Sequence, residues 1–131
     1  MPALAKGEMS MPRTPKPRRW RPGVLKNLLQ RDVVDMLVLI LLNRRAMYGR
    51  EIIRYLAALT DNVLIYDKLN VPLSRLERQG FIQVTNTPLG GDRARVYFVI
   101  TELGQKHLQE MTEDYRLFAE AMGKVVDAPE L

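Results

Sequence analysis

The spacing of apolar residues in this 131-residue chain changes from a helical to a strand period at Gly80. Before that glycine, Leu69, Leu73 and Leu76 stand at positions i, i+4 and i+7, which places them on one face of a helix. After it, residues 82–85 alternate apolar and polar side chains, as a half-buried strand does. Glycine readily adopts the left-handed conformation with which many helices end. The pattern therefore predicts a helix that ends at Gly80 and leads directly into a strand.

Two further helices are predicted ahead of this one. The nearly apolar run 33–42 is well short of the roughly 20 residues that cross a bilayer, so we expect a buried helix. Asp32 directly precedes this run and is expected to be the N-cap. Asp35 lies within the run, where it would be an acid of the first helical turn. Residues 48–59 are predicted to form an amphipathic helix because their apolar positions recur with helical spacing, at Ile52, Ile53, Leu56 and Leu59.

The third helix should present one face to a partner. Pro72 fits only a first helical turn, so regular helix is expected from about Asn70. At about 100° per residue, the face opposite the leucines carries Asp67, Val71, Ser74, Arg75 and Arg78. On this exposed face Arg75 and Arg78 are predicted to bond to guanine edges or phosphates, and Asn70 to adenine, with Ser74 beside them. The alternative is a solvated face on which Arg78 only stabilises the helix C-terminus.

A β-hairpin is predicted to follow. Residues 81–87 and 96–100 read as its strands, joined by a turn rich in glycine. Arg93 and Arg95 are two residues apart, so on a strand they would share a face suited to phosphate contact. Three helices and a hairpin predict a mainly α fold with a small β-hairpin (α+β), a winged helix-turn-helix domain over residues 23–101.

The last segment, residues 102–131, has a heptad pattern. Its apolar side chains are spaced alternately three and four residues apart: Leu108, Met111, Tyr115, Phe118, Met122 and Val125. In so short a helix such a stripe more often packs against the protein's own core. Because the leucines of the first three helices are expected to close that core, we interpret the segment as a C-terminal dimerisation helix and tail.

Charge is distributed unevenly, although the chain as a whole carries only +5. Residues 1–22 hold six Lys and Arg against one Glu and five of the eight prolines, which predicts a basic, flexible arm. Residues 44–95 hold nine basic against five acidic side chains, and residues 96–131 hold three against seven. A polyanion such as double-stranded DNA is the expected partner of the arm, through Arg18, Arg19 and Arg21. The alternative is a leader without a specific role.

The start of the second helix is a further predicted phosphate site. Helix N-termini bind anions through free backbone amides, and Tyr48 lies there with Arg44 and Arg45 close by. The alternative is that Tyr48 only covers the core.

Catalysis has little support in the sequence. There is no cysteine, the single histidine, His107, is expected to be exposed, and no lysine accompanies the glycines at 90 and 91 to make a phosphate loop. We therefore predict no enzyme, no metal and no cofactor. With neither a membrane span nor a secretory signal expected, the predicted location is the prokaryotic cytoplasm, at the nucleoid.

From Asp32 to Leu108 the chain resembles the PadR family of bacterial transcription regulators. The motifs that match, in order, are Met47-Tyr48-Gly49-Arg50-Glu51-Ile52, Leu73-Ser74-Arg75-Leu76-Glu77-Arg78-Gln79-Gly80-Phe81-Ile82, Gly91-Asp92-Arg93-Ala94-Arg95-Val96-Tyr97-Phe98 and Ile100-Thr101-Glu102-Leu103-Gly104. The resemblance implies a homodimeric DNA-binding repressor whose last helix makes the dimer and, in some members, a small hydrophobic effector near that interface. One departure is Asn70, which stands where the family commonly has a DNA-contacting tyrosine.

Two functions follow from these patterns. The first is a sequence-specific transcriptional regulator, a dimeric repressor that binds an inverted repeat through the third helix and the wing. The alternative is a winged-helix module that binds a protein, which the unusual residues Asn70 and Pro72 would favour.

Overall fold

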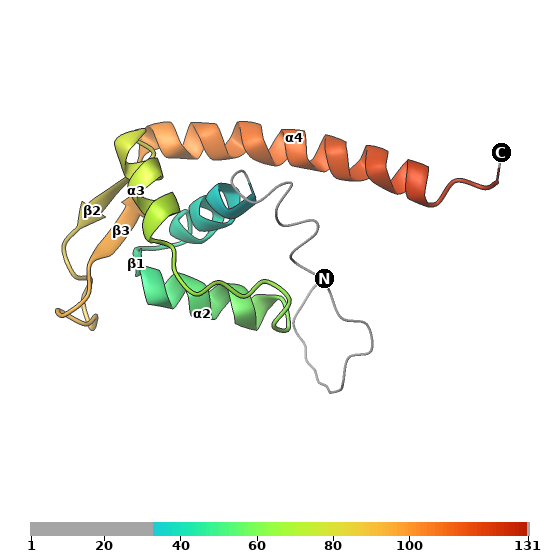
Figure 1. Ribbon diagram of the computed structural model, residues 1–131. Coiled ribbons are helices and arrows are strands. Elements are labelled where there is room, and N and C mark those ends of the chain that lie inside the picture. The colour runs from blue at the N-terminus through green and yellow to red at the C-terminus, as the bar shows by residue number, and fades with distance from the viewer. Residues whose placement is uncertain (1–32, 131) are drawn as a thin grey trace.

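The computed structural model describes residues 33–130. The predicted arm with Arg18, Arg19 and Arg21, and the N-cap predicted at Asp32, lie outside the described residues. After helical residues 33–42 come, in order, β1 (Met47–Tyr48), α2 (Gly49–Leu59), α3 (Asn70–Arg78), β2 (Ile82–Thr85), β3 (Tyr97–Ile100) and α4 (Glu102–Val126) (Figure 1). The prediction of an α+β fold with a small hairpin is confirmed. Among the described residues, no helix is long and apolar enough to cross a membrane.

The end of α3 lies where the change of period predicts it. Gly80 has a φ of +84°, and its N–H donates to the Glu77 carbonyl over 3.0 Å. The N–H of Phe81 donates to the Leu76 carbonyl, also over 3.0 Å. These two bonds form a Schellman motif, which satisfies the last carbonyls of the helix and turns the chain into β2. The predicted helix start at Asn70 is confirmed as well.

The sheet is antiparallel with strand order β1-β3-β2, so β3 is its central strand. Phe98 of β3 pairs with Met47 on one side and with Val84 on the other. The strand β1 was not predicted, because two residues are too few to show an alternating pattern. Because β1 pairs with β3 and leads directly into α2, it joins the start of α2 to the base of the hairpin.

Arg93 and Arg95 do not lie on a strand, so the prediction that they share a strand face is wrong. The reason is a second tight turn after the hairpin tip. The Asp92 carboxylate accepts a bond from the Ala94 N–H over 2.9 Å, and the Asp92 carbonyl accepts one from the Arg95 N–H over 3.0 Å. Asp side chains commonly cap turns in this way. Both arginines are therefore exposed on a loop, and β3 begins only at Tyr97.

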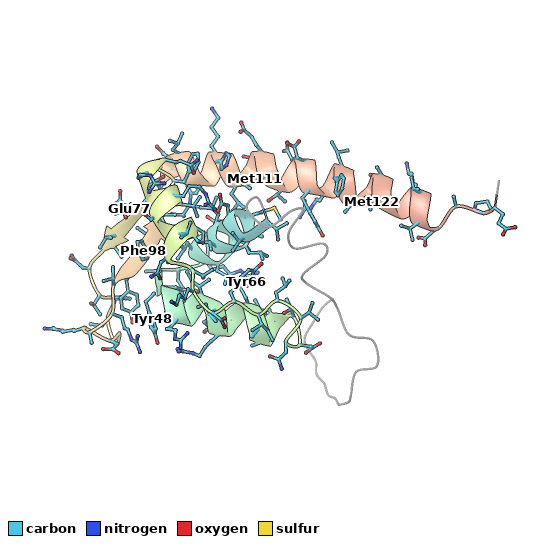
Figure 2. The ribbon with its side chains drawn as sticks, viewed as in Figure 1. Tyr48, Tyr66, Glu77, Phe98, Met111 and Met122 are labelled. Carbon is cyan, nitrogen blue, oxygen red and sulfur yellow. The ribbon has the colours of Figure 1, made fainter. Side chains whose placement is uncertain are left out.

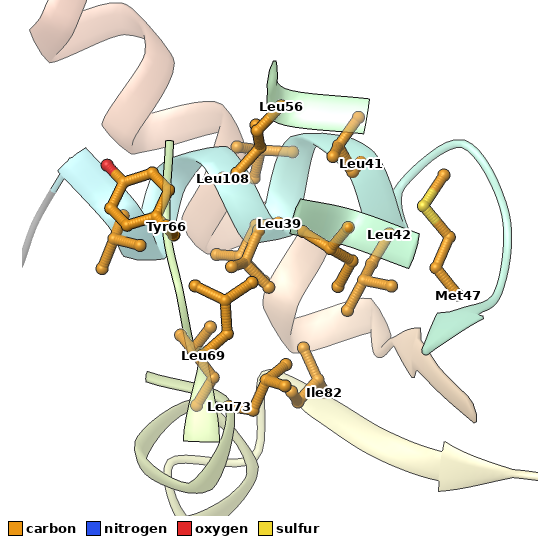
Figure 3. Close-up of a cluster of buried hydrophobic side chains, with 14 residues drawn as sticks. Leu39, Leu41, Leu42, Met47, Leu56, Tyr66, Leu69, Leu73, Ile82 and Leu108 are labelled. Atoms are coloured by element: carbon orange, nitrogen blue, oxygen red, sulfur yellow. The ribbon is translucent and has the colours of Figure 1, made fainter. Parts of the chain in front are cut away.

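The core gathers side chains from all three first helices, the sheet and α4 (Figure 3). Leu39, Ile52 and Leu76 are fully buried at its centre. Leu108 of α4 is also buried, with 7% exposure, and Met111 packs at the edge of the same cluster. The expectation that the first three helices close the core by themselves is thus wrong, because α4 supplies part of the apolar cover.

The predicted heptad stripe is consequently divided in two. Its first two members pack into the domain, while the rest of α4 extends beyond the body of the protein (Figure 1). Four large side chains of the stripe are left exposed on that extension: Tyr115, Phe118, Met122 and Val125.

The beginning of α4 is fixed to the end of α3. The Thr101 hydroxyl accepts from the Gly104 N–H over 3.0 Å as an N-cap, and donates to the Gly80 carbonyl over 2.6 Å. The Thr101 N–H donates to the Phe81 carbonyl over 2.9 Å. The His107 ring stacks on Phe81 at 4.2 Å between centroids, so this histidine is half-buried rather than exposed as expected. One junction therefore orients α3, the sheet and α4 relative to one another.

Gly104 has no room for a side chain at this junction. A Cβ there would lie 2.1 Å from the Phe81 carbonyl oxygen and 2.8 Å from Ile100 Cγ1. We expect Gly104→Ala to lower the free energy of unfolding in urea by about 2–3 kcal/mol, because backbone must move to relieve the overlap. Gly123→Ala is the matched control, since nothing lies within 4 Å of its Cβ position. It should raise the stability by about 0.5–1 kcal/mol. Equal effects of the two substitutions would contradict this packing.

Candidate nucleic-acid interface

The outer face of α3, defined here as Asn70, Val71, Ser74 and Arg78, lies opposite the buried leucines and is exposed. Arg78 Nη1 donates to the Ser74 hydroxyl over 3.1 Å, a bond between neighbouring turns of the helix. The face therefore presents an amide, a hydroxyl and one guanidinium. These groups can bond to base edges in a DNA major groove.

Arg75 does not belong to this face, and the prediction that places it among the exposed DNA-reading residues is wrong. Its guanidinium turns inward to Asp35 of the first helix, with Nε donating to Oδ2 over 3.2 Å and Nη2 donating to Oδ1. The two side chains retain only 13% and 10% exposure. A carboxylate buried in an apolar helix needs a counter-charge, and a guanidinium supplies two parallel bonds to it. Asp35 is thus a core partner of α3, beyond the helix-terminus role that the sequence suggested.

Two arginines converge on Tyr48, the residue that precedes α2. The guanidinium carbon of Arg54 lies 5.6 Å and that of Arg95 lies 5.1 Å from the centre of the Tyr48 ring, within the range of cation–π attraction. Arg54 Nη2 also donates to the Tyr48 hydroxyl over 2.8 Å. That hydrogen bond raises the pKa of Arg54, so the group stays charged. Figure 2 shows Tyr48 between the start of α2 and the hairpin.

The same tyrosine connects α2 to the hairpin. Its ring meets the Tyr97 ring edge to face, with 5.3 Å between centroids. Tyr97 is buried, and its hydroxyl accepts the Asp92 N–H over 3.0 Å. Arg95 makes a second, looser contact with Asp92, 3.6 Å between Nε and Oδ2. We call Tyr48, Arg54, Arg95 and Tyr97 the wing-base cluster.

Sequence reasoning did not identify Arg54. It lies six positions from Tyr48, a spacing that does not by itself align two residues on one helix face. Their contact arises because Tyr48 belongs to a strand while Arg54 belongs to the helix that follows. No periodicity in the sequence signals such a contact.

Arg44 and Arg45, which are also predicted to contact phosphate at the start of α2, differ in whether their guanidinium groups already have partners. Arg45 Nη2 donates to Glu51 Oε2 and to the Tyr55 hydroxyl, both over 2.9 Å, and the bond to Glu51 raises the pKa of Arg45. Glu51 also accepts the Tyr48 N–H over 3.3 Å, so one of the amides predicted to hold a phosphate already has a partner. Arg44 is exposed in the preceding turn. Within residues 33–130, Arg45 contacts Glu51 and Arg95 contacts Asp92, whereas Arg44, Arg50 and Arg54 form no ion pair with a carboxylate.

Comparison with known proteins gives a family-level match. A family model described as the transcriptional regulator PadR-like family matches residues 38–110, more than half of the chain. A search of curated protein sequences finds no match. The matched range runs from the first helix through the hairpin into α4, and so includes the outer face of α3 and the wing-base cluster.

Solved structures give the same picture. A transcriptional regulator from Clostridium thermocellum is 27% identical, aligned over 77% of this chain and 99% of that one, with a TM-score of 0.67. A PadR family regulator from Eggerthella lenta is 24% identical over 82% of this chain and 93% of its own, with a TM-score of 0.63. A PadR-like regulator from Bacillus cereus is 18% identical over 79% and 99%, with a TM-score of 0.68. The last two likenesses establish the fold, which is that of winged-helix regulators.

The Asp35–Arg75 ion pair can be tested by its effect on stability. Arg75→Gln leaves a buried carboxylate without its counter-charge, so we expect the free energy of unfolding to fall by about 3 kcal/mol. Arg78→Gln is the control, because it makes the same change about one helical turn further along α3, on the exposed face. It should alter stability by less than about 0.5 kcal/mol. Urea unfolding of Arg75→Gln, Asp35→Asn and the double variant Asp35→Asn/Arg75→Gln measures the coupling, with Arg78→Gln unfolded in parallel. A double variant whose loss equals the sum of the single losses would contradict the pairing.

Proposed function

Because this chain belongs to the PadR-like family of transcriptional regulators and is thereby a DNA-binding regulator, we propose that it is a homodimeric repressor that binds an inverted repeat. In this proposal the outer face of α3 enters the major groove, and the hairpin, as the wing, follows the neighbouring backbone and minor groove. The protein acts on the chromosome in the cytoplasm of a prokaryotic cell.

The observation that carries the proposal is the position of the cations at the hairpin, at its base and before β1. Arg93, Arg95 and Arg54 lie at the hairpin and its base, and Arg44 lies in the turn before β1. Phosphate contacts of this kind position a protein on the duplex without reading sequence. Asn70, Ser74 and Arg78, which can bond to bases, lie on the helix itself. We assign affinity to the first group and sequence reading to the second.

Dimerisation is supported by the far part of α4. Tyr115, Phe118, Met122 and Val125 form a stripe of heptad spacing whose members are about half exposed or more. Exposed apolar stripes of this kind mark contact surfaces. A second copy is the partner that fits, since two identical stripes are complementary under two-fold symmetry. Two-fold symmetry in turn requires an operator made of two inverted half-sites.

Two elements of the proposal rest on sequence and family alone. Contacts of Arg18, Arg19 and Arg21 with DNA concern residues outside the described part of the chain. A small hydrophobic effector is implied by the family resemblance, and it stays a prediction here.

DNA binding is tested by selecting duplexes from a random library with the full chain. We expect an inverted repeat, bound with an affinity that falls steeply as salt rises. Arg93→Ala should reduce the slope of log K against log salt by about 1 per protomer, for every sequence alike. Arg78→Ala should instead cost about 1–3 kcal/mol at one position of each half-site and relax the sequence preference there. Fluorescence anisotropy of labelled duplexes measures both quantities.

The control for these variants is Arg116→Ala, which removes an exposed positive charge from α4. It should leave the slope and the selected sequence unchanged. A chain that selects no operator would overturn the proposal, and binding that in addition does not depend on salt would favour the protein-binding alternative.

Dimerisation has its own test. Phe118→Glu places a charge in the exposed stripe, and we expect the protein to elute as a folded monomer with weakened operator binding. Leu117→Glu introduces the same charge at a comparably exposed position about 130° around the helix from the stripe. It should remain dimeric. Identical molar masses of the two variants in light scattering would refute the assignment of this interface.

A further inference from the structure

The tip of the wing is a tight turn that displays a leucine. The Gly91 N–H donates to the Pro88 carbonyl over 2.8 Å, and Gly90 has a φ of +81°. These are features of a type II turn, in which the third residue takes a positive φ. Leu89 occupies the second position and is fully exposed, more than any other large apolar side chain of the described residues. The turn thus carries an apolar side chain at its outermost point.

This turn is held to the body of the domain. The buried Tyr97 hydroxyl accepts the N–H of Asp92, the residue that directly follows the turn. A Cβ on Gly91 would lie 2.9 Å from the Tyr97 hydroxyl and 2.9 Å from the Pro88 carbonyl oxygen, so only glycine permits this close approach. The position of Leu89 is therefore set by the core of the wing through Tyr97.

The surroundings of Leu89 suit a nucleic acid. Arg93 and Arg95 follow on the same loop and are exposed, whereas Gly90 and Gly91 contribute no side chains. Asp92 lies between the glycines and these arginines, and its carboxylate is 3.6 Å from Arg95 Nε. The tip itself is therefore apolar, and the loop behind it carries two positive charges and one negative charge. The minor groove of B-DNA is about 6 Å wide and is lined by phosphates on both sides. Its floor at A·T pairs lacks the amino group that guanine places there.

We propose that Leu89 enters the DNA minor groove beside each half-site and selects A·T pairs there by apolar contact with the groove floor. The proposal rests on the function proposed above and adds a second source of specificity to α3. A guanine amino group would meet the leucine without a hydrogen-bond acceptor, which disfavours G·C pairs. Apolar side chains of other minor-groove proteins insert between base steps and kink the duplex, so leucine is compatible with this groove even without such insertion.

A protein partner is the other macromolecule that an exposed leucine fits. Specific protein interfaces need a sizeable apolar patch, and single exposed apolar residues are ordinary. Here the residues that follow Leu89 are glycines and charged side chains. The wing therefore favours an anionic groove over an apolar protein surface.

The test compares Leu89→Ser with the unchanged protein on the operator selected from the random library. On duplexes with A·T flanks we expect affinity on the order of tenfold weaker, since the contact of a buried leucine is lost. On duplexes with G·C flanks the two proteins should bind alike. Leu59→Ser removes another exposed leucine, at the end of α2, and should have no effect on either duplex. Because Leu89 makes no contribution to the core, the variant is expected to fold normally.

Modified bases identify the groove. Inosine·cytosine pairs in the flanks lack the guanine amino group, so they resemble A·T pairs in the minor groove and G·C pairs in the major groove. We expect the unchanged protein to bind inosine·cytosine flanks as tightly as A·T flanks. Equal binding to inosine·cytosine and G·C flanks, or unaltered flank preference in Leu89→Ser, would overturn the inference while leaving the regulator function intact. Failure of the proposed function would appear earlier, as the absence of any selected operator.

Discussion

The buried ion pair between Asp35 and Arg75 is the interaction on which the orientation of α3 depends. Residues 33–42 are otherwise nearly apolar, so their one carboxylate has to be neutralised within the fold. Arg75 supplies the charge and thereby fixes α3 about its own axis against the first helix. With that rotation set, Asn70, Ser74 and Arg78 face outward. The interaction removes one of two guanidinium groups from the face, which leaves Arg78 with the Asn70 amide and the Ser74 hydroxyl as its hydrogen-bonding groups.

A second constraint lies at the junction of α3, the sheet and α4. The Schellman turn at Gly80 and the Thr101 cap share the Gly80–Phe81 backbone, and Gly104 lets the two helices approach it. The helix proposed to form the dimer is therefore joined directly to the end of the helix proposed to read DNA. In the proposed dimer, this short hydrogen-bonded connection would let the spacing of the two α4 helices set the spacing of the two α3 helices. Half-site separation would follow from this junction.

Residues close in sequence were predictable, whereas contacts made at a distance were not. The end of α3 and the hairpin strands depend on neighbouring residues, and the sequence alone located them. Arg75 was misplaced because helical periodicity gives the direction of its Cα–Cβ bond but not the reach of a long side chain to Asp35, forty positions away. The share of Leu108 in the core and the contact of Arg54 with Tyr48 depend on the packing of whole elements.

The basic and acidic segments of the chain lie in different parts of the fold. Residues 44–95, with nine basic and five acidic side chains, form α2, α3 and the hairpin, whereas the acidic residues of 96–131 lie mostly along α4. Figure 1 shows that the far half of α4 points away from the hairpin. A polyanion attracts the first region and repels the second, so the field of the protein orients it hairpin-first before any contact forms. In the proposed function, orientation and affinity thus come from charges that read no sequence, and α3 and the wing tip are the parts assigned to discriminate among sites.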